Sequence, residues 1–463
     1  MHVLILRRSA LVSGYPDSLI GYQDSISPEL AAMMLITAAV ITVRKVCTNL
    51  GFYSTSLATK LTPNPLDYWA MNKFTRATNA GLSAAGQILC LFLALLFGSA
   101  AVAEIRIQET PDGGVQPRLT VDDNGNIHLL YFKKRLSAPS AREGNLYYRQ
   151  FLPEQNRFGL PVKVSSNAFD IRTFAIARAS IAVGGDGRIH VVWYLPRDNQ
   201  YFYTRSNTER SQFEAQQPVV DVFSEGLDAG ADIAALGTQV AIVWGAGALS
   251  REYERTVYGR ISNDSGATFG DELQMGSKEF GACACCSLAT NFGDENELAI
   301  AYRSAIDGVG RHMQTLTLQF SDKVVQEGQY AELSDLQEWE LSACPLSTND
   351  ITVDAQANQW LVFETEGRIN QLQLGMGGDA MPVAEPFIET RQKNPAVAVN
   401  NQGDRLIVWG EAISQTRGGR LNMHLFADDG SDKNTGFTEE VSIPQFSFPA
   451  AAVLPSGDFL VLY

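Results

Sequence analysis

The chain has 463 residues, which is enough for one large domain or roughly two to three ordinary ones. Of these residues 45% are hydrophobic, as in a globular protein, and the formal net charge at pH 7 is −15. Because an acidic surface repels phosphate groups and anionic lipids, we expect neither a nucleic acid nor a membrane surface as a partner.

Residues 71–103 have every part of a secretory signal peptide. Its basic start contains Lys73 and Arg76, residues 88–97 form its apolar core, and a cleavage site of small residues ends at Ala103. Cleavage near Ala103 predicts a periplasmic or secreted protein with no stable membrane span. The alternative is that the apolar part of this segment remains as an uncleaved anchor.

The first 70 residues do not have the composition of a folded domain, and their one apolar run, 30–43, is too short to span a membrane comfortably. Signal peptides stand at the start of a translated chain. We therefore predict that translation begins at Met71 and that residues 1–70 are a mis-annotated or unstructured extension.

From residue 104 to residue 463 the sequence repeats an apolar strand, a turn and a second apolar strand that ends in an aromatic residue. The second strands cover residues 127–131, 189–193, 240–244, 298–302, 359–363, 405–409 and 459–463. Their last aromatic residues lie 46 to 62 residues apart, a spacing typical of β-propeller blades. The sequence therefore predicts an all-β fold over 104–463, a β-propeller of four-stranded blades.

Seven second strands predict seven blades. The chain ends inside a strand, so we expect the strand near residues 105–108 to complete the last blade. Joining both ends of the ring in one sheet removes an open sheet edge.

The clearest turn motif covers residues 262–269. Asp264 can accept hydrogen bonds from backbone N–H groups of its own loop, Gly266 can take a positive φ, and Thr268 can cap the turn. The motif Ser-x-Asp-x-Gly-x-Thr-aromatic resembles the Asp box, or BNR repeat, of sialidases and related β-propellers. This resemblance implies a structural, non-catalytic hairpin whose defining residues are Ser262, Asp264, Gly266, Thr268 and Phe269. Because sialidases of this family have six blades, six is the alternative to seven.

Four cysteines lie in the repeating part, namely Cys283, Cys285, Cys286 and Cys344. The first three precede the first strand of the fourth repeat, and Cys344 precedes that of the fifth. In a propeller the loops that enter the innermost strands meet at one mouth of the central channel, so we expect all four cysteines there, on adjacent blades.

These cysteines allow two kinds of site. Export favours one or two disulfides between the two loops, and Cys285 should not pair with Cys286 because a vicinal disulfide is strained. The alternative is a thiolate site for Cu(I) or Zn(II), since three crowded thiols disfavour clean pairing and thiolates are soft ligands.

A second resemblance covers about residues 281–350. The order Cys-x-Cys-Cys, Tyr302-Arg303, Arg311 and Cys344-Pro345 resembles a bacterial group of exported sialidase-like BNR proteins. This chain departs from the group's pattern in the residue after Arg311 and in the residue before Cys344. The resemblance implies the fold and export, and it implies no activity.

Sialidases of the known type bind the substrate carboxylate with three arginines and use a tyrosine nucleophile, a glutamate partner and an aspartate acid/base. Guanidinium groups suit this task because they pair with a planar carboxylate in bidentate fashion. Arg118, Arg178, Arg303 and Arg311 stand near predicted strand ends and are the candidates for ligand binding. For each of them an inter-blade or surface salt bridge is the alternative. No tyrosine–glutamate pair can be assigned, so the catalytic residues are unknown.

The leading hypothesis is an exported sialidase-like propeller that binds a glycan or a small anionic ligand at the cysteine-lined channel mouth, with or without catalysis. One alternative is a divergent exo-glycosidase of the sialidase type. The other is a periplasmic thiolate protein that binds Cu or Zn. The sequence predicts no oligomeric state.

Overall fold

The computed structural model describes residues 103–463 apart from 138–141, 172–174, 229, 295, 321–331, 386–389, 415–416 and 434–439. The predicted extension and the predicted signal peptide up to residue 102 lie outside the described residues. Val102–Tyr463 forms one compact unit. Within the described part, no helix is both long enough and apolar enough to cross a membrane.

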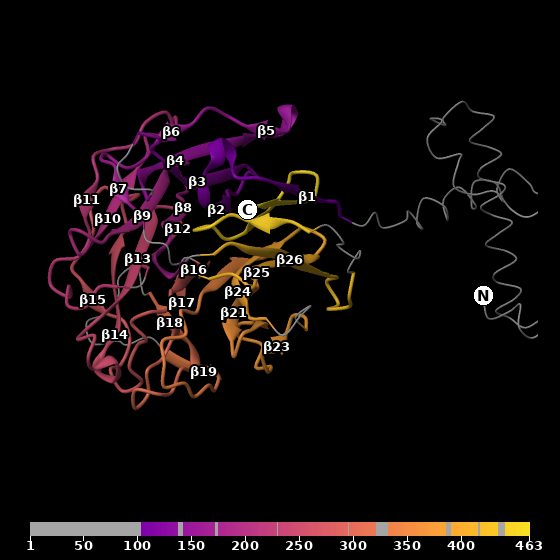
Figure 1. Ribbon diagram of the computed structural model, residues 1–463. Helices are drawn as coiled ribbons and strands as arrows, with labels where there is room; N and C mark the ends of the chain where they lie inside the picture. Colours follow the sequence, from indigo (N-terminus) through magenta and orange to yellow (C-terminus); the bar gives the residue numbers. More distant parts are fainter. Residues whose placement is uncertain are drawn as a thin grey trace, which may run out of the picture. The chain divides into compact units, whose positions relative to one another are not determined.

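Seven β-sheets follow one another along the chain and are arranged as the blades of a propeller (Figure 1). Blade 1 contains β2 (Val115–Val121), β3 (Ile127–Lys134), β4 (Glu143–Leu152), β5 (Arg157–Phe158), β6 (Val162–Lys163) and β7 (Phe169–Asp170). Blade 2 contains β8 (Ser180–Val183), β9 (Ile189–Leu195), β10 (Gln200–Arg205) and β11 (Gln217–Pro218). Blade 3 contains β12 (Asp232–Leu236), β13 (Gln239–Ala246), β14 (Thr256–Ser262) and β15 (Leu273–Gln274).

Blades 4 to 6 have four strands each, like blades 2 and 3, whereas blade 7 has three. Blade 4 contains β16 (Ala289–Asp294), β17 (Glu297–Arg303), β18 (Met313–Gln319) and β19 (Glu332–Gln337). Blade 5 contains β20 (Asn349–Val353), β21 (Gln359–Thr365), β22 (Arg368–Gln373) and β23 (Met381–Pro382). Blade 6 contains β24 (Gln392–Val399), β25 (Arg405–Glu411), β26 (Gly419–Phe426) and β27 (Ser442–Ile443). Blade 7 contains β28 (Ala450–Val453), β29 (Phe459–Leu462) and β1 (Ile105–Gln108). The described helices are short 3-10 turns, Pro111–Gly113, Pro153–Gln155, Ala175–Ala177 and Glu252–Glu254.

Blade 7 closes the ring by combining both ends of the described chain. Strand β1 pairs in parallel with β29, with Ile105 opposite Phe459 and Gln108 opposite Leu462. Each innermost strand contacts that of the next blade, and β28 contacts β2. The prediction of seven blades is therefore confirmed, and the six-blade alternative is wrong.

The core lies between neighbouring blades. Every residue of β9 and of β25 is buried, because the second strand of a blade is covered on both faces. One cluster packs Tyr203 of blade 2 against Trp244 and Tyr258 of blade 3. Packing on both faces therefore requires strands of nearly continuous apolar residues. A strand in which apolar and polar residues alternate would bury its polar side chains.

The two ends of the central channel differ, because loops enter the innermost strands at one end and turns leave them at the other. We call the entry end the cysteine mouth and the exit end the turn mouth. Tight turns at residues 122–126, 184–188, 354–358, 400–404 and 454–458 form much of the turn mouth. Several of them are closed by the same device: Asp122, Asp354 and Asn400 each accept backbone N–H groups two and four residues further on, at 2.8 to 3.0 Å.

The hairpin at residues 262–269 has the hydrogen bonds expected from its sequence. Asp264 accepts the backbone N–H of Thr268 at 2.9 Å and its hydroxyl at 2.7 Å, while the Ser262 hydroxyl accepts the N–H of Gly266 at 2.9 Å. Gly266 has φ 72°, and Phe269 packs edge-on against Tyr203 of blade 2 at 5.0 Å. Burial acts to raise the pKa of Asp264, but hydrogen bonds from Thr268 and Ser262 outweigh it and lower that pKa to about 2. The hairpin therefore ties blade 3 to blade 2.

Candidate functional site

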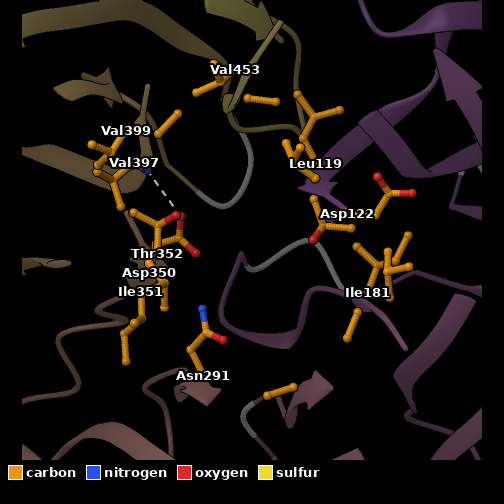
Figure 2. Close-up of a pocket in the computed structure, with 18 of the residues that line it drawn as sticks. Leu119, Asp122, Ile181, Asn291, Asp350, Ile351, Thr352, Val397, Val399 and Val453 are labelled. Atoms are coloured by element: carbon orange, nitrogen blue, oxygen red, sulfur yellow. Dashed lines mark hydrogen bonds between the residues drawn. The ribbon is translucent and has the colours of Figure 1, made fainter. Parts of the chain in front are cut away.

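A cavity of about 600 Å³ fills the channel on the side of the turn mouth. The innermost strands of all seven blades line it, from Arg118, Asp232 and Asp350 at its inner end to the turns. Figure 2 shows Asn291, Thr352 and Asp350 at the cavity wall beside the apolar side chains of Ile181, Val397, Val399 and Val453. A concave site with a few polar groups among apolar ones can bind a small polar molecule.

The inner end of the cavity is a network of charged groups contributed by different blades. Arg118 Nη1 lies 2.9 Å from Asp350 Oδ1, and Arg118 Nη2 lies 3.9 Å from Asp232 Oδ1. Arg178 Nη2 lies 4.0 Å from Asp350 Oδ1 and donates to the carbonyl of Asn349 at 2.7 Å. These pairs join blades 1, 2, 3 and 5 across the channel, so they close its inner end.

Burial perturbs the charged groups of this network. It raises the pKa of Asp232, although Arg118 and hydrogen bonds from Ser180 and from the backbone of Thr290 act in the opposite direction. Burial, with the nearby positive charge of Arg118, lowers the pKa of Arg178 to about 10. The pKa of Arg118 is raised because Asp350 and Asp232 outweigh its burial. Opposite charges therefore compensate one another here, as buried charges must.

All four cysteines of the repeating part lie together at the cysteine mouth. Disulfides join Cys283 to Cys286 and Cys285 to Cys344, so the second one links the loops that enter blades 4 and 5. The sulfur atoms of Cys283 and Cys285 are 3.5 Å apart. The first three cysteines are buried in a cluster with Ile176, Ala177 and Leu346, whereas Cys344 is exposed. The loops of blades 2, 4 and 5 thus meet over this mouth.

Arg303 makes hydrogen bonds to both of the loops that carry the cysteines. Its side chain is buried, and it donates to the carbonyls of Arg311 at 2.8 Å and of Glu364, and to the Ser347 hydroxyl at 3.3 Å. Its own carbonyl accepts the backbone N–H of Cys283 at 2.9 Å. Burial lowers the pKa of Arg303 to about 10. This arginine is therefore a buried cross-link between blades.

Arg311 is also buried and also joins two blades. Its Nη2 donates to Glu252 Oε2 at 2.7 Å, and the other oxygen of that carboxylate accepts the N–H of Ala284 at 2.7 Å. The ion pair thus fixes the Cys-x-Cys-Cys loop to a loop of blade 3. All four candidate arginines make contacts of this inter-blade kind, which was the alternative to ligand binding for each of them.

The carboxylates at the centre of the site were not identified from the sequence. Asp232 and Asp350 contact Arg118 from blades 3 and 5, and Asp350 also accepts the N–H of Val397 of blade 6 at 3.2 Å. A signal was available, because Asp232 begins an apolar strand that is otherwise without charge. An acidic residue in a strand that lines a propeller channel is rarely placed there by packing alone.

Several buried tyrosines have partners other than glutamate. The hydroxyl of Tyr131 donates to Asp112 at 2.7 Å, that of Tyr302 to Gln314 at 2.7 Å, and that of Tyr203 pairs with His190 at 2.8 Å. Burial raises the pKa of all three phenols. A raised pKa disfavours the phenolate, so none of these groups is prepared to act as a nucleophile.

No family model and no curated protein matches the chain. Among solved structures, it is similar to an α-L-arabinanase from Penicillium chrysogenum, with 10% identity and a TM-score of 0.45 over 71% of this chain and 98% of that one. It is also similar to the Aleuria aurantia lectin AAL, with 9% identity and a TM-score of 0.43 over 72% and 96%. The NanB sialidase from Streptococcus pneumoniae has 8% identity and a TM-score of 0.42 over 70% of both chains. At these values the similarities carry no argument about function.

Proposed function

We propose that this propeller is an exported protein that binds a neutral glycan, or a polyol of similar size, in the channel cavity at the turn mouth. The observation that carries the proposal is the cavity of about 600 Å³ that all seven blades enclose. Its volume lies within the range of roughly 300–1,000 Å³ that is usual for small-molecule sites. The cysteine mouth, by contrast, is filled by packed and disulfide-linked loops.

The charge of the cavity favours a neutral ligand over an anion. One arginine lines it, Arg118, and it is paired with Asp350. The lining aspartates are Asp122, Asp123, Asp232, Asp350 and Asp354. Carboxylates accept hydrogen bonds from hydroxyl groups, so a neutral glycan suits this lining, whereas the anionic ligand expected from the sequence would be repelled.

Export agrees with the cysteine chemistry. Two disulfides join the four cysteines of the propeller, and disulfides persist in oxidising compartments such as the periplasm. The signal peptide predicted at residues 71–103 would deliver the protein there. Mass spectrometry of the unreduced mature protein tests this point, and we expect a chain that begins near Glu104 with all four cysteines oxidised.

Binding can be tested by calorimetry with neutral oligosaccharides selected on a glycan array. Asn291 stands at the cavity wall, so Asn291→Trp should fill the cavity and weaken binding by about tenfold or more, a loss of ~1.4 kcal/mol. The matched control is Leu160→Trp, because Leu160 is 86% exposed and does not line the cavity. Equal affinities for the two variants would show that the cavity is not the binding site.

A second candidate function is hydrolysis of a neutral glycoside. Asp232 has a raised pKa, and it faces Asp350 across Arg118 at the inner end of the cavity. Two carboxyl groups in different environments can serve as the acid and the base of a glycosidase. Turnover of a nitrophenyl glycoside that is lost in Asp232→Asn, while glycan affinity stays within about twofold, would establish this activity.

A further inference from the structure

We propose that the four cysteines form a thiol–disulfide relay, in which reducing equivalents from an external dithiol enter at exposed Cys344 and reach buried Cys286. This activity is separate from ligand binding at the turn mouth. It rests on one contact and one contrast. The contact is the 3.5 Å between Cys283 Sγ and Cys285 Sγ, which belong to different disulfides. The contrast is the burial of three cysteines beside an exposed fourth.

The first step takes place at the surface. A thiolate of the dithiol attacks Cys344 Sγ, and the bond between Cys344 and Cys285 breaks with its electron pair on Cys285. The second thiolate of the dithiol then releases Cys344 as a thiol, and the dithiol leaves as its own disulfide. The dithiol has lost two electrons and two protons. Cys344 is the accessible sulfur of this pair, since Cys285 is only 7% exposed.

The second step takes place inside the cluster. The Cys285 thiolate lies within reach of Cys283 Sγ, because attack in a bound geometry begins at roughly 3–3.5 Å. It forms a bond with Cys283, the bond between Cys283 and Cys286 breaks, and the electron pair leaves on Cys286, which takes up a proton. The product carries thiols at Cys286 and Cys344 and one disulfide, between Cys283 and Cys285. Both electrons from the dithiol are then accounted for.

Two cationic side chains lie beside the cysteine loops, each paired with a glutamate, and positive charge near a sulfur stabilises its thiolate. Lys393 Nζ lies 3.6 Å from Glu364 Oε2 and donates to the carbonyl of Pro345, next to Cys344, at 2.8 Å. Arg311 reaches the N–H of Ala284, between Cys283 and Cys285, through one glutamate. Arg311 Nε and Nη1 are buried and have no hydrogen-bond partner among the described residues, while its Nη2 is paired with Glu252.

The decisive experiment maps the thiols after the addition of one equivalent of dithiothreitol to the full-length protein as purified. The reaction is stopped with acid, the thiols are alkylated in denaturant, and peptides are quantified by mass spectrometry. Among the reduced molecules, we expect alkylation of Cys344 in all of them and of Cys286 in about half. Two independent disulfides would instead give alkylation of Cys285 and Cys344 alone, and that result would overturn the relay. Four free thiols and bound metal in the protein as purified would also overturn it, in favour of a thiolate metal site.

Two single variants test the inner step without any reductant. In Cys344→Ser the free Cys285 should exchange with the buried disulfide, so that the thiol is divided between Cys285 and Cys286. In Cys286→Ser the free Cys283 should attack Cys285 and release Cys344, which native-state maleimide labelling detects because that residue is exposed. The proposal would be contradicted if the free thiol of Cys344→Ser stayed on Cys285. It would also be contradicted if natively folded Cys286→Ser did not react with maleimide.

Discussion

The two mouths of the channel are built in different ways. At the turn mouth, one hydrogen-bonding device recurs from blade to blade, with Asp122, Asp354 and Asn400 each closing a turn within its own blade. The cysteine mouth is held differently, because the Cys285–Cys344 disulfide, the buried Arg303 and the ion pair of Arg311 with Glu252 each join residues of different blades. The repeated end leaves an open cavity, and the irregular end is packed shut.

This difference shows where a propeller can change without losing its fold. Local turns close individual blades, and the ring is held by packing between neighbouring blades and by the pairing of β1 with β29. Long-range contacts at the cysteine mouth then cross-link a ring that is already specified. We therefore expect changes at the cysteine mouth to cost stability without altering binding in the cavity, and changes in the turns to have small, local effects.

The largest effect should follow removal of the long disulfide. Cys285 and Cys344 are 59 residues apart, so the double variant Cys285→Ser with Cys344→Ser should lose about 4 kcal/mol of unfolding free energy. The matched variant, Cys283→Ser with Cys286→Ser, opens a bridge across a separation of 3 and should lose about 2 kcal/mol. Urea unfolding measures both values. Equal losses would show that the length of the closed loop does not set the stabilisation, and a loss of glycan affinity in the first variant would show that the two mouths are not independent.

The next effect concerns Arg303, the buried cross-link below the cysteine loops. Arg303→Ala leaves the carbonyls of Arg311 and Glu364 without this donor, so we expect a loss of about 3 kcal/mol. Arg197→Ala is the control, because its side chain is 91% exposed and should change stability by less than about 0.5 kcal/mol. Thermal unfolding compares the two. A near-neutral Arg303→Ala would show that the cysteine mouth is held by its disulfides alone.

The same contrast explains what could be predicted from the sequence. The seven second strands and the turn around Asp264 depend on residues close in the chain, and both were predicted. The positions of Asp232 and Asp350 depend on contacts across the channel, which spacing does not encode. Spacing placed the four cysteines on adjacent blades, but it left open which cysteines pair and whether they hold a metal instead. It could not show that Ile176 and Leu346 pack against the cysteines at that end, because this packing depends on contacts between different blades.

A smaller effect is expected at the hairpin of blade 3, and it depends on pH. The pKa of Asp264 is about 2 in the folded protein, below the value of about 3.9 for an unfolded chain. Its contribution is therefore present above pH ~4 and is lost as the pH falls toward 2. Because the side chain is exposed, Asp264→Ala should lose only about 1 kcal/mol at pH 7, and the difference from the wild type should vanish near pH 2. Asp123→Ala, at an exposed position of the turn mouth, should show no such difference at either pH.

The smallest effect tests the repeat itself, by exchanging one position between two equivalent turns. Gly125 and Ala357 each donate the backbone N–H to the backbone carbonyl of the aspartate three residues earlier, and their φ angles are 76° and 65°. A side chain at positive φ destabilises the folded state by about 1–2 kcal/mol. Glycine avoids this strain, but it loses more chain entropy on folding, which offsets roughly 0.5–1 kcal/mol of the gain. Ala357→Gly should therefore stabilise the protein by about 0.5–1 kcal/mol. Gly125→Ala should destabilise it by a similar amount, because a Cβ at Gly125 would meet no atom within 4 Å and the backbone strain alone remains. Opposite shifts in unfolding temperature would show that the turns are interchangeable parts, whereas shifts of the same sign would show that each blade sets its own turn.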